Sequence, residues 1–141
     1  SPNGCRIASV SLDRIMCLWN SESGEREQML QGHSSRVNCV AFSPNGNQRV
    51  SGSADKTIVL WNIELGERVP VIRVLIDLVL SIAFSPHGQR IVYCCCDTSI
   101  RDTAGGAVFG TLITTAAYSP AGDLIATGGY DYNLRIWEAK S

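Results

Sequence analysis

Three side chains of the types found in hydrolytic triads lie close together in the sequence, at His33, Ser51 and Asp55. In such a triad the histidine takes a proton from the serine hydroxyl, and the aspartate orients the histidine. The reaction also needs an exposed nucleophile and an oxyanion hole, and the elbow motif G-x-S-x-G that often supplies them does not occur in this sequence. What these residues do therefore depends on the elements that position them.

Two other patterns could indicate a ligand-binding site, but both are incomplete. Gly105 and Gly110 have the spacing of a phosphate-binding loop, but Thr111 stands where that loop requires lysine, and no helix is predicted to follow. His87 lies in a Ser-Pro-x-Gly turn and has no second ligand in register with it. We therefore expect no cofactor and no metal ion.

Six cysteines are distributed unevenly along the chain. Cys94, Cys95 and Cys96 are consecutive in one predicted strand, where neighbouring side chains point to opposite faces and do not bind one ion together without a bend. The sequence contains no C-x-x-C pair and no N-x-S/T acceptor for glycosylation. We expect reduced cysteines that pack as small apolar residues, as in a cytoplasmic protein.

An internal repeat organises the chain. Residues 1–20 align with residues 43–62 without a gap, which places Asp13 on Asp55 and Trp19 on Trp61. Residues 37–46 align in the same way with residues 79–88, and a fourth copy, residues 113–138, follows the third after a shorter interval. A repeat of about 40 residues is typical of solenoids and propellers, so it largely decides the fold class.

Each repeat is predicted to consist of strands. "VNCVAF", at 37–42, is rich in β-branched and apolar residues and runs into the turn signal Ser-Pro-Asn-Gly. "TIVLWN", at 57–62, is apolar on both faces, because Ile58 and Leu60 point one way while Val59 and Trp61 point the other. A strand buried on both faces lies between two neighbouring sheets. Units of about 40 residues with four strands each, packed face to face, describe the blades of a propeller.

The chain resembles the WD-repeat β-propeller family over essentially its whole length. The resemblance is carried by Gly32-His33, by the turns "FSP" and "YSP", and by the apolar-Trp endings at Trp19, Trp61 and Trp137. It implies an all-β propeller of four-stranded antiparallel blades that forms an incomplete ring, with fourteen strands in three and a half blades. The repeat parts of this single propeller segment are expected at 1–33, 34–75, 76–110 and 111–141. Family members enter each blade at the innermost strand, so the chain is expected to start and stop within a blade.

The resemblance also gives His33, Ser51, Asp55 and Trp61 a structural role. In WD repeats the turn aspartate holds the histidine, the histidine reaches the strand hydroxyl, and the hydroxyl reaches the indole N–H, so that these buried polar groups all have partners. We expect the network to be complete in the second blade only. The matching positions in the other repeats are Ser9, Asp13 and Trp19, then Asp97, then Thr127, Asp131 and Trp137.

The third repeat departs most from this pattern. Leu75 and Tyr93 replace the histidine and the hydroxyl, and the apolar-Trp pair is missing at Arg101 and Asp102, which predicts a short third strand. The connection before this repeat, residues 69–84, is unusually apolar. The segment is either buried in the space that the missing tryptophan leaves, or it is an exposed patch that binds a partner or a second copy of the chain.

The length and net charge of the chain bear on how the ring is completed and on which classes of partner are expected. A chain of 141 residues is short for a closed propeller of about four to eight blades, so we expect a longer chain or a homodimer to complete the ring. The net charge of −1, from 12 basic and 13 acidic residues, gives no broad electrostatic surface for nucleic acid or an anionic membrane. No apolar segment approaches the roughly 18 residues of a membrane-spanning helix.

We therefore expect a non-catalytic scaffold for protein–protein interaction, whose partner is a protein or peptide. In the family, partners contact the face where the inner strands begin and the structural aspartates gather, and tyrosine and arginine are enriched in binding hot spots. The partner-binding residues carried over to this face are Arg14, Arg36, Lys56, Leu78, Tyr130 and Tyr132. The alternative is a carbohydrate-binding propeller lectin, in which Tyr118, Tyr130 and Tyr132 would contact the sugar.

Overall fold

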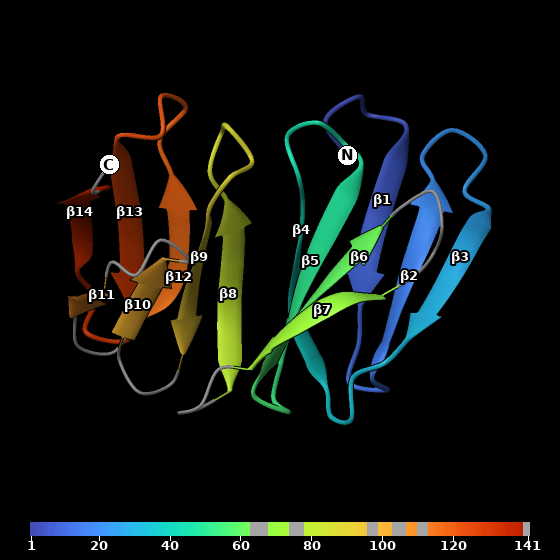
Figure 1. Cartoon of the computed structure of the whole chain (residues 1–141), viewed down its shortest axis with the longest axis horizontal. Helices are drawn as coiled ribbons and strands as arrows, with labels where there is room; N and C mark the ends of the chain where they lie inside the picture. Colours follow the sequence, from blue (N-terminus) through green and yellow to red (C-terminus); the bar gives the residue numbers. More distant parts are fainter. Residues whose placement is uncertain (63–67, 74–77, 96–98, 103–106, 110–112, 140–141) are drawn as a thin grey trace.

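The computed structural model describes the backbone of residues 1–62, 68–73, 78–95, 99–102, 107–109 and 113–139, and the side chains of residues 1–62, 78–95 and 113–139. Within these ranges the chain forms fourteen β-strands and no helix, and hence no helix that could cross a membrane (Figure 1). The strands are β1 (Arg6–Val10), β2 (Ile15–Asn20), β3 (Arg26–Gln31), β4 (Val37–Phe42), β5 (Gln48–Ser53), β6 (Thr57–Asn62), β7 (Arg68–Arg73), β8 (Val79–Phe84), β9 (Ile91–Cys95), β10 (Ser99–Asp102), β11 (Ala107–Phe109), β12 (Ile113–Tyr118), β13 (Leu124–Gly129) and β14 (Leu134–Glu138).

The strands form four antiparallel sheets in which the spatial order follows the chain order. The first sheet is β1-β2-β3, the second β4-β5-β6-β7, the third β8-β9-β10-β11 and the fourth β12-β13-β14. The sheets stand side by side along the molecule (Figure 1). The predicted all-β fold of antiparallel propeller blades is confirmed, and in the described residues the first and fourth blades have three strands each.

The turns that join the strands lie at two opposite sides of the molecule (Figure 1). On one side each repeat makes its Ser-Pro-x-Gly turn, and we call this side the Ser-Pro-turn face. On the other side the hairpins β1-β2, β5-β6 and β13-β14 turn at Asp13, Asp55 and Asp131. We call this side the Asp-turn face.

The Ser-Pro-x-Gly turns are built alike and contact one another. The Gly122 amide donates a hydrogen bond to the carbonyl of Ser119 at 2.9 Å, and Gly122 has a φ of 79°, a conformation that side chains rarely allow. A Cβ atom on Gly122 would also lie 3.2 Å from Cδ of Pro86, and one on Gly88 would lie 3.4 Å from Cδ of Pro44. The proline of one turn therefore packs against the glycine of the next, which explains why the motif repeats with both residues.

Apolar clusters fill the spaces between successive sheets. The buried members between the first and second sheets are Met16, Leu30, Val59 and Trp61. Those between the second and third sheets are Val50, Ile58, Val79, Ile82, Ile91 and Cys95, and those between the third and fourth are Val92, Cys94, Ile113, Ala116 and Ile125. Ile58 and Val59, adjacent in β6, thus belong to different clusters, which confirms that this strand is buried on both faces.

The third sheet is the least regular. Its strand β10 has four residues where β6 has six, as expected for the repeat that lacks the apolar-Trp pair. Residues 68–73 form β7, the fourth strand of the second sheet, so much of the apolar segment 69–84 is strand and not connection. Val79 and Ile82 in β8 are buried, which favours burial for this part of the segment. Leu75 lies outside the described residues, and so does the aspartate predicted for this blade, Asp97.

The five cysteines in the described residues, Cys5, Cys17, Cys39, Cys94 and Cys95, are free. Burial raises the pKa of Cys39 and of Cys94 to about 12, so both thiols stay protonated and unreactive at neutral pH. Cys94 and Cys95 belong to clusters on opposite faces of the third sheet, as the alternation of a strand requires. Cys96 lies outside the described residues.

Candidate functional site

Four polar side chains of the second repeat form one connected network beside the Asp-turn face. His33 Nδ1 lies 2.9 Å from Asp55 Oδ2, and His33 Nε2 lies 2.7 Å from Ser51 Oγ. Trp61 Nε1 donates a hydrogen bond to the same Ser51 oxygen at 2.8 Å. The order Asp, His, Ser is that of a hydrolytic triad, but Ser51 has no exposed surface and also accepts the indole hydrogen. The serine is therefore not presented to a substrate, and the arrangement joins β5, β6 and the loop before β4.

The charge of Asp55 is stabilised by the hydrogen bonds that it accepts. Burial raises the pKa of this carboxyl group, but hydrogen bonds from Thr57 Oγ1 at 2.6 Å, from the Ser34 amide at 2.8 Å and from His33 outweigh that effect. Together they lower the pKa from the usual 3.8 to about 2. Asp55 therefore stays ionised across the physiological pH range and holds the loop at Ser34 against the β5-β6 turn.

The residue after each turn aspartate adopts a left-handed backbone. The φ angles are 74° at Arg14, 65° at Lys56 and 60° at Tyr132. Such a conformation costs a non-glycine residue of order 1 kcal/mol. The aspartate offsets this cost because its side chain accepts a hydrogen bond from the backbone amide two residues later. Asp55 Oδ1 lies 3.0 Å from the Thr57 nitrogen, and Asp13 and Asp131 accept the same bond from Ile15 and Asn133. In the first, second and fourth blades the turn thereby presents one long, exposed side chain on the Asp-turn face.

The first and fourth repeats keep only part of the network. Trp19 Nε1 donates to Ser9 Oγ at 2.8 Å, and Trp137 Nε1 donates to Thr127 Oγ1 at 2.9 Å. In the fourth repeat, Asp131 pairs with Arg135, and this hydrogen bond holds the pKa of the aspartate at about 2. The indole-to-hydroxyl bond is thus common to three repeats, whereas the histidine link occurs in the second repeat among the described residues.

The residues predicted to bind a partner lie at the Asp-turn face. Arg14, Arg36 and Lys56 are exposed, and Leu78, just before β8, is half-buried. Tyr130 is 74% exposed and Tyr132 is 99% exposed.

The structure also shows a groove of about 370 Å³ between the first two blades on this face, lined by Asp13, Arg14, Ile15, Gln31, Gly32, His33 and Ser34. Ile15, Gln31 and Ser34 were not predicted as site residues, because the groove forms between a turn and a loop that are distant in the chain.

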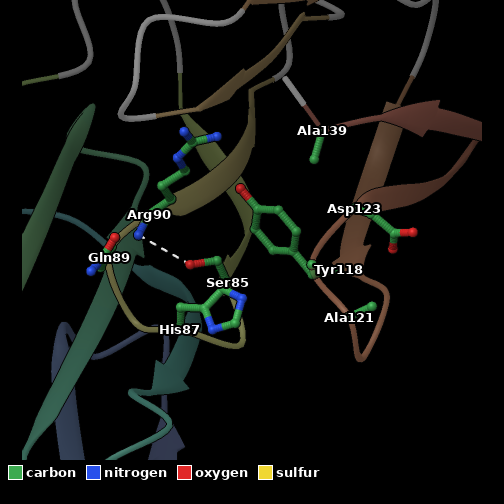
Figure 2. Close-up of a pocket in the computed structure, with 9 residues that line it drawn as sticks. Ser85, His87, Gln89, Arg90, Tyr118, Ala121, Asp123 and Ala139 are labelled. Atoms are coloured by element: carbon green, nitrogen blue, oxygen red, sulfur yellow. Dashed lines mark hydrogen bonds between the residues drawn. The ribbon is translucent and has the colours of Figure 1, made fainter. Parts of the chain in front are cut away.

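A second groove, of about 320 Å³, lies between the third and fourth blades on the Ser-Pro-turn face. Figure 2 shows Tyr118 projecting toward Ser85 and Arg90 across this groove, where Ser85 Oγ accepts a hydrogen bond from the Arg90 amide at 3.1 Å. Tyr118 ends β12 here, whereas Tyr130 and Tyr132 follow β13 on the opposite face. The three tyrosines expected to bind sugar in a lectin are therefore not brought together, because successive turns of an antiparallel sheet lie at opposite sides.

Arg49 is a buried cation that the repeat did not predict. Its side chain is completely buried, its Nη2 donates to Gln28 Oε1 at 3.0 Å, and its Nε and Nη1 have no hydrogen-bond partner. Burial and the nearby Arg6 lower its pKa to about 10, and Glu27 partly opposes this shift. The matching residue of the fourth repeat is Ile125, which is also buried. Arg49 therefore occupies a core position that other repeats fill with an aliphatic side chain.

Two comparisons with known proteins agree with this geometry. The family model "WD domain, G-beta repeat" matches residues 24–62, 72–101 and 108–138. A stretch of 42 residues, 30% of the chain, is 43% identical to the U5 small nuclear ribonucleoprotein 40 kDa protein of Pongo abelii. This match spans 12% of that relative's length. The segments matched by the family model include strands from all four sheets.

Proposed function

Because the chain belongs to the WD domain, G-beta repeat family, we propose that it is a non-catalytic scaffold that binds a protein or peptide segment on its Asp-turn face. Repeats of this family indicate a protein-interaction module. The fold itself does not determine which surface is used, so the choice of face depends on the residues exposed there.

The observation that carries the proposal is the in-phase projection of long side chains from one face. Arg14, Lys56 and Tyr132 occupy the same position in three blades, share the left-handed conformation and are exposed. Each is held by an aspartate that anchors the turn, so the side chains project from rigid supports. Pre-organised anchors lose less conformational entropy on binding than mobile ones, which favours their use as contacts.

The fourth blade adds an aromatic surface to the same face. Tyr130 and Tyr132 lie on either side of Asp131, and both rings are largely exposed. Tyrosine supplies a large contact area together with a hydroxyl group and is enriched at interaction hot spots. The similarity to a component of a small nuclear ribonucleoprotein also supports a role in assembly with other proteins.

The exposed side of the fourth sheet supports self-association as part of this function. Leu134 is 80% exposed and Ile136 is 68% exposed, whereas the matching residues of the second sheet, Ile58 and Leu60, pack against the third sheet. We propose that the Leu134-Ile136 side packs against a sheet of a second copy in a homodimer. Light scattering should then give about twice 15.3 kDa, and a variant with Leu134→Thr and Ile136→Thr should be a monomer. A wild-type monomer at all concentrations would contradict the homodimer.

The binding face is tested by peptide selection with variants of each face. A phage-displayed peptide library is selected on the immobilised chain, and the dissociation constants of enriched peptides are measured. The Asp-turn variant carries Arg14→Asn, Tyr130→Ser and Tyr132→Asn, because asparagine tolerates the left-handed backbone. The control carries His87→Ser and Gln89→Ser, at exposed positions of the Ser-Pro-turn face.

We expect the Asp-turn variant to lose at least about tenfold in affinity, as hot-spot substitutions do, while the control variant binds as the wild type does. Enriched peptides that lose affinity only with the control variant would contradict the choice of face. A library that yields no peptide above background would contradict binding by this chain altogether.

A further inference from the structure

The charges of the first two blades are divided between the two faces. Arg14, Arg36 and Lys56 are exposed on the Asp-turn face, and none of them has an ion-pair partner among the described residues. Among the described residues of the first two blades, two carboxylates lie on this face. Asp13 is exposed, whereas the side chain of Asp55 is only 7% exposed and is occupied by its hydrogen bonds. In the described part of the first two blades, a partner therefore meets three cations and one accessible carboxylate.

The opposite face of the first blade carries charges of both signs. Glu22 and Glu25 lie in the β2-β3 turn, and Arg26 lies at the start of β3 on the same side. Glu27 pairs with Arg6 at 2.8 Å, so this pair adds no net charge. The overall charge of −1 thus conceals a group of unpaired cations on the Asp-turn face of the first two blades.

A groove lies within the basic region. Its lining includes Arg14 from the first blade and the loop at Ser34, next to Arg36, from the second. With a volume of about 370 Å³ it is large enough for a few side chains of an extended segment, since pockets for small ligands begin at roughly 300 Å³. Opposite charges across an interface steer association and select the partner.

We propose that the partner segment bound on the Asp-turn face is an acidic peptide that lies along this groove, with its carboxylates against Arg14, Arg36 and Lys56. This inference rests on the proposed function and specifies the chemistry of its partner. A peptide fits better than a nucleic acid. A DNA-binding surface makes on the order of 6 to 10 phosphate contacts, whereas the described part of this surface supplies three unpaired cations.

The test uses two fluorescein-labelled peptides as probes, one in which glutamate alternates with leucine over nine residues and one in which every glutamate is replaced by glutamine. Binding to the 141-residue chain is followed by fluorescence anisotropy at low and at high salt. The cation variant carries Arg14→Asn, Arg36→Gln and Lys56→Asn. The control variant carries Arg26→Gln, which removes an exposed cation from the opposite face. Circular dichroism confirms that each variant is folded.

We expect the glutamate peptide to bind at least about tenfold more tightly than the glutamine peptide, and salt to weaken it, as expected for exposed charges. The cation variant should lose about tenfold in affinity for the glutamate peptide, and the Arg26 variant should bind as the wild type does. Equal binding of both peptides, no binding of either at millimolar concentration, or equal losses in the two variants would overturn the inference.

Tighter binding of a labelled oligothymidine through the same three cations would overturn it in favour of a nucleic acid. If the acidic peptide fails while library peptides still bind through Tyr130 and Tyr132, the proposed function stands and only the acidic partner is wrong.

Discussion

Replacement of Asp55 by asparagine should change how the stability of the molecule depends on pH. The folded state lowers the pKa of this carboxyl group from 3.8 to about 2. A carboxyl group with a lowered pKa stabilises the folded state above its unfolded pKa, and this stabilisation is lost as the pH falls through the folded pKa. The stabilisation from Asp55 should therefore be complete above about pH 5 and mostly gone by pH 2.5.

The size of the effect follows from the shift. One pKa unit corresponds to about 1.4 kcal/mol, so a shift from 3.8 to about 2 is worth roughly 1 to 2 kcal/mol once solvent screening at the edge of the blade is allowed for. Asparagine keeps the shape of the side chain but has no charge to lose. Between pH 6 and pH 2.5 the wild type should lose roughly 1 to 2 kcal/mol more of its free energy of unfolding than Asp55→Asn does.

The assay is urea unfolding, followed by tryptophan fluorescence, at several pH values between 6 and 2.5. Asp13→Asn is the matched control, because Asp13 holds the same position in the first repeat and is exposed, and among the described residues it makes no hydrogen bond with a histidine. The control should reproduce the pH dependence of the wild type more closely than Asp55→Asn does. If Asp55→Asn and the wild type lose stability in parallel, the hydrogen bonds to Asp55 do not stabilise its charge, and the reasoning is refuted.

Four further substitutions test the packing between the blades, each by urea unfolding at neutral pH. Arg49→Met should raise the free energy of unfolding by roughly 1 kcal/mol, because it removes a buried cation with two unpaired donor nitrogens from an apolar position; a loss of about 3 kcal/mol would contradict a net cost of burying this cation. Gly52→Ala should cost about 1 to 3 kcal/mol, since its Cβ would lie 2.5 Å from Cγ1 of Val79, and an unchanged midpoint would contradict that contact. Trp61→Phe should cost more than Trp137→Phe, because Trp61 is buried and Trp137 is partly exposed; equal costs would contradict the difference in burial.

The fold could be predicted from the sequence because residues typical of the same turns and strands recur at the same positions of the repeats. Asp13 and Asp55, and Trp19 and Trp61, fall in phase, and each pair marks the same turn or strand. Alternation along residues 57–62 correctly placed Ile58 on one face and Val59 on the other. Such features depend on neighbours within one blade, which lie close together in the sequence.

The remaining features depend on contacts between blades. The burial of Arg49 arises because Gln28, on β3 of the preceding sheet, faces it, and no local pattern indicates this pairing. The Asp-turn groove likewise forms where the turn at Arg14 meets the loop at Ser34. The group of cations on the Asp-turn face likewise brings together Arg14, Arg36 and Lys56, which belong to turns that are distant in the chain. The repeat also gave no sign of the left-handed backbone at Arg14, since non-glycine residues seldom adopt it.

Chemical-shift mapping locates the surface that binds a peptide, and it therefore tests the proposal that this surface is the Asp-turn face. Amide spectra of the isotopically labelled chain are recorded while an enriched library peptide is added. The account predicts that the largest shifts fall at residues 12–14, 34–36, 54–56 and 130–132, around the turn aspartates. Shifts concentrated at residues 2–4, 44–46, 86–88 and 120–122 would place the peptide on the Ser-Pro-turn face and would contradict the account.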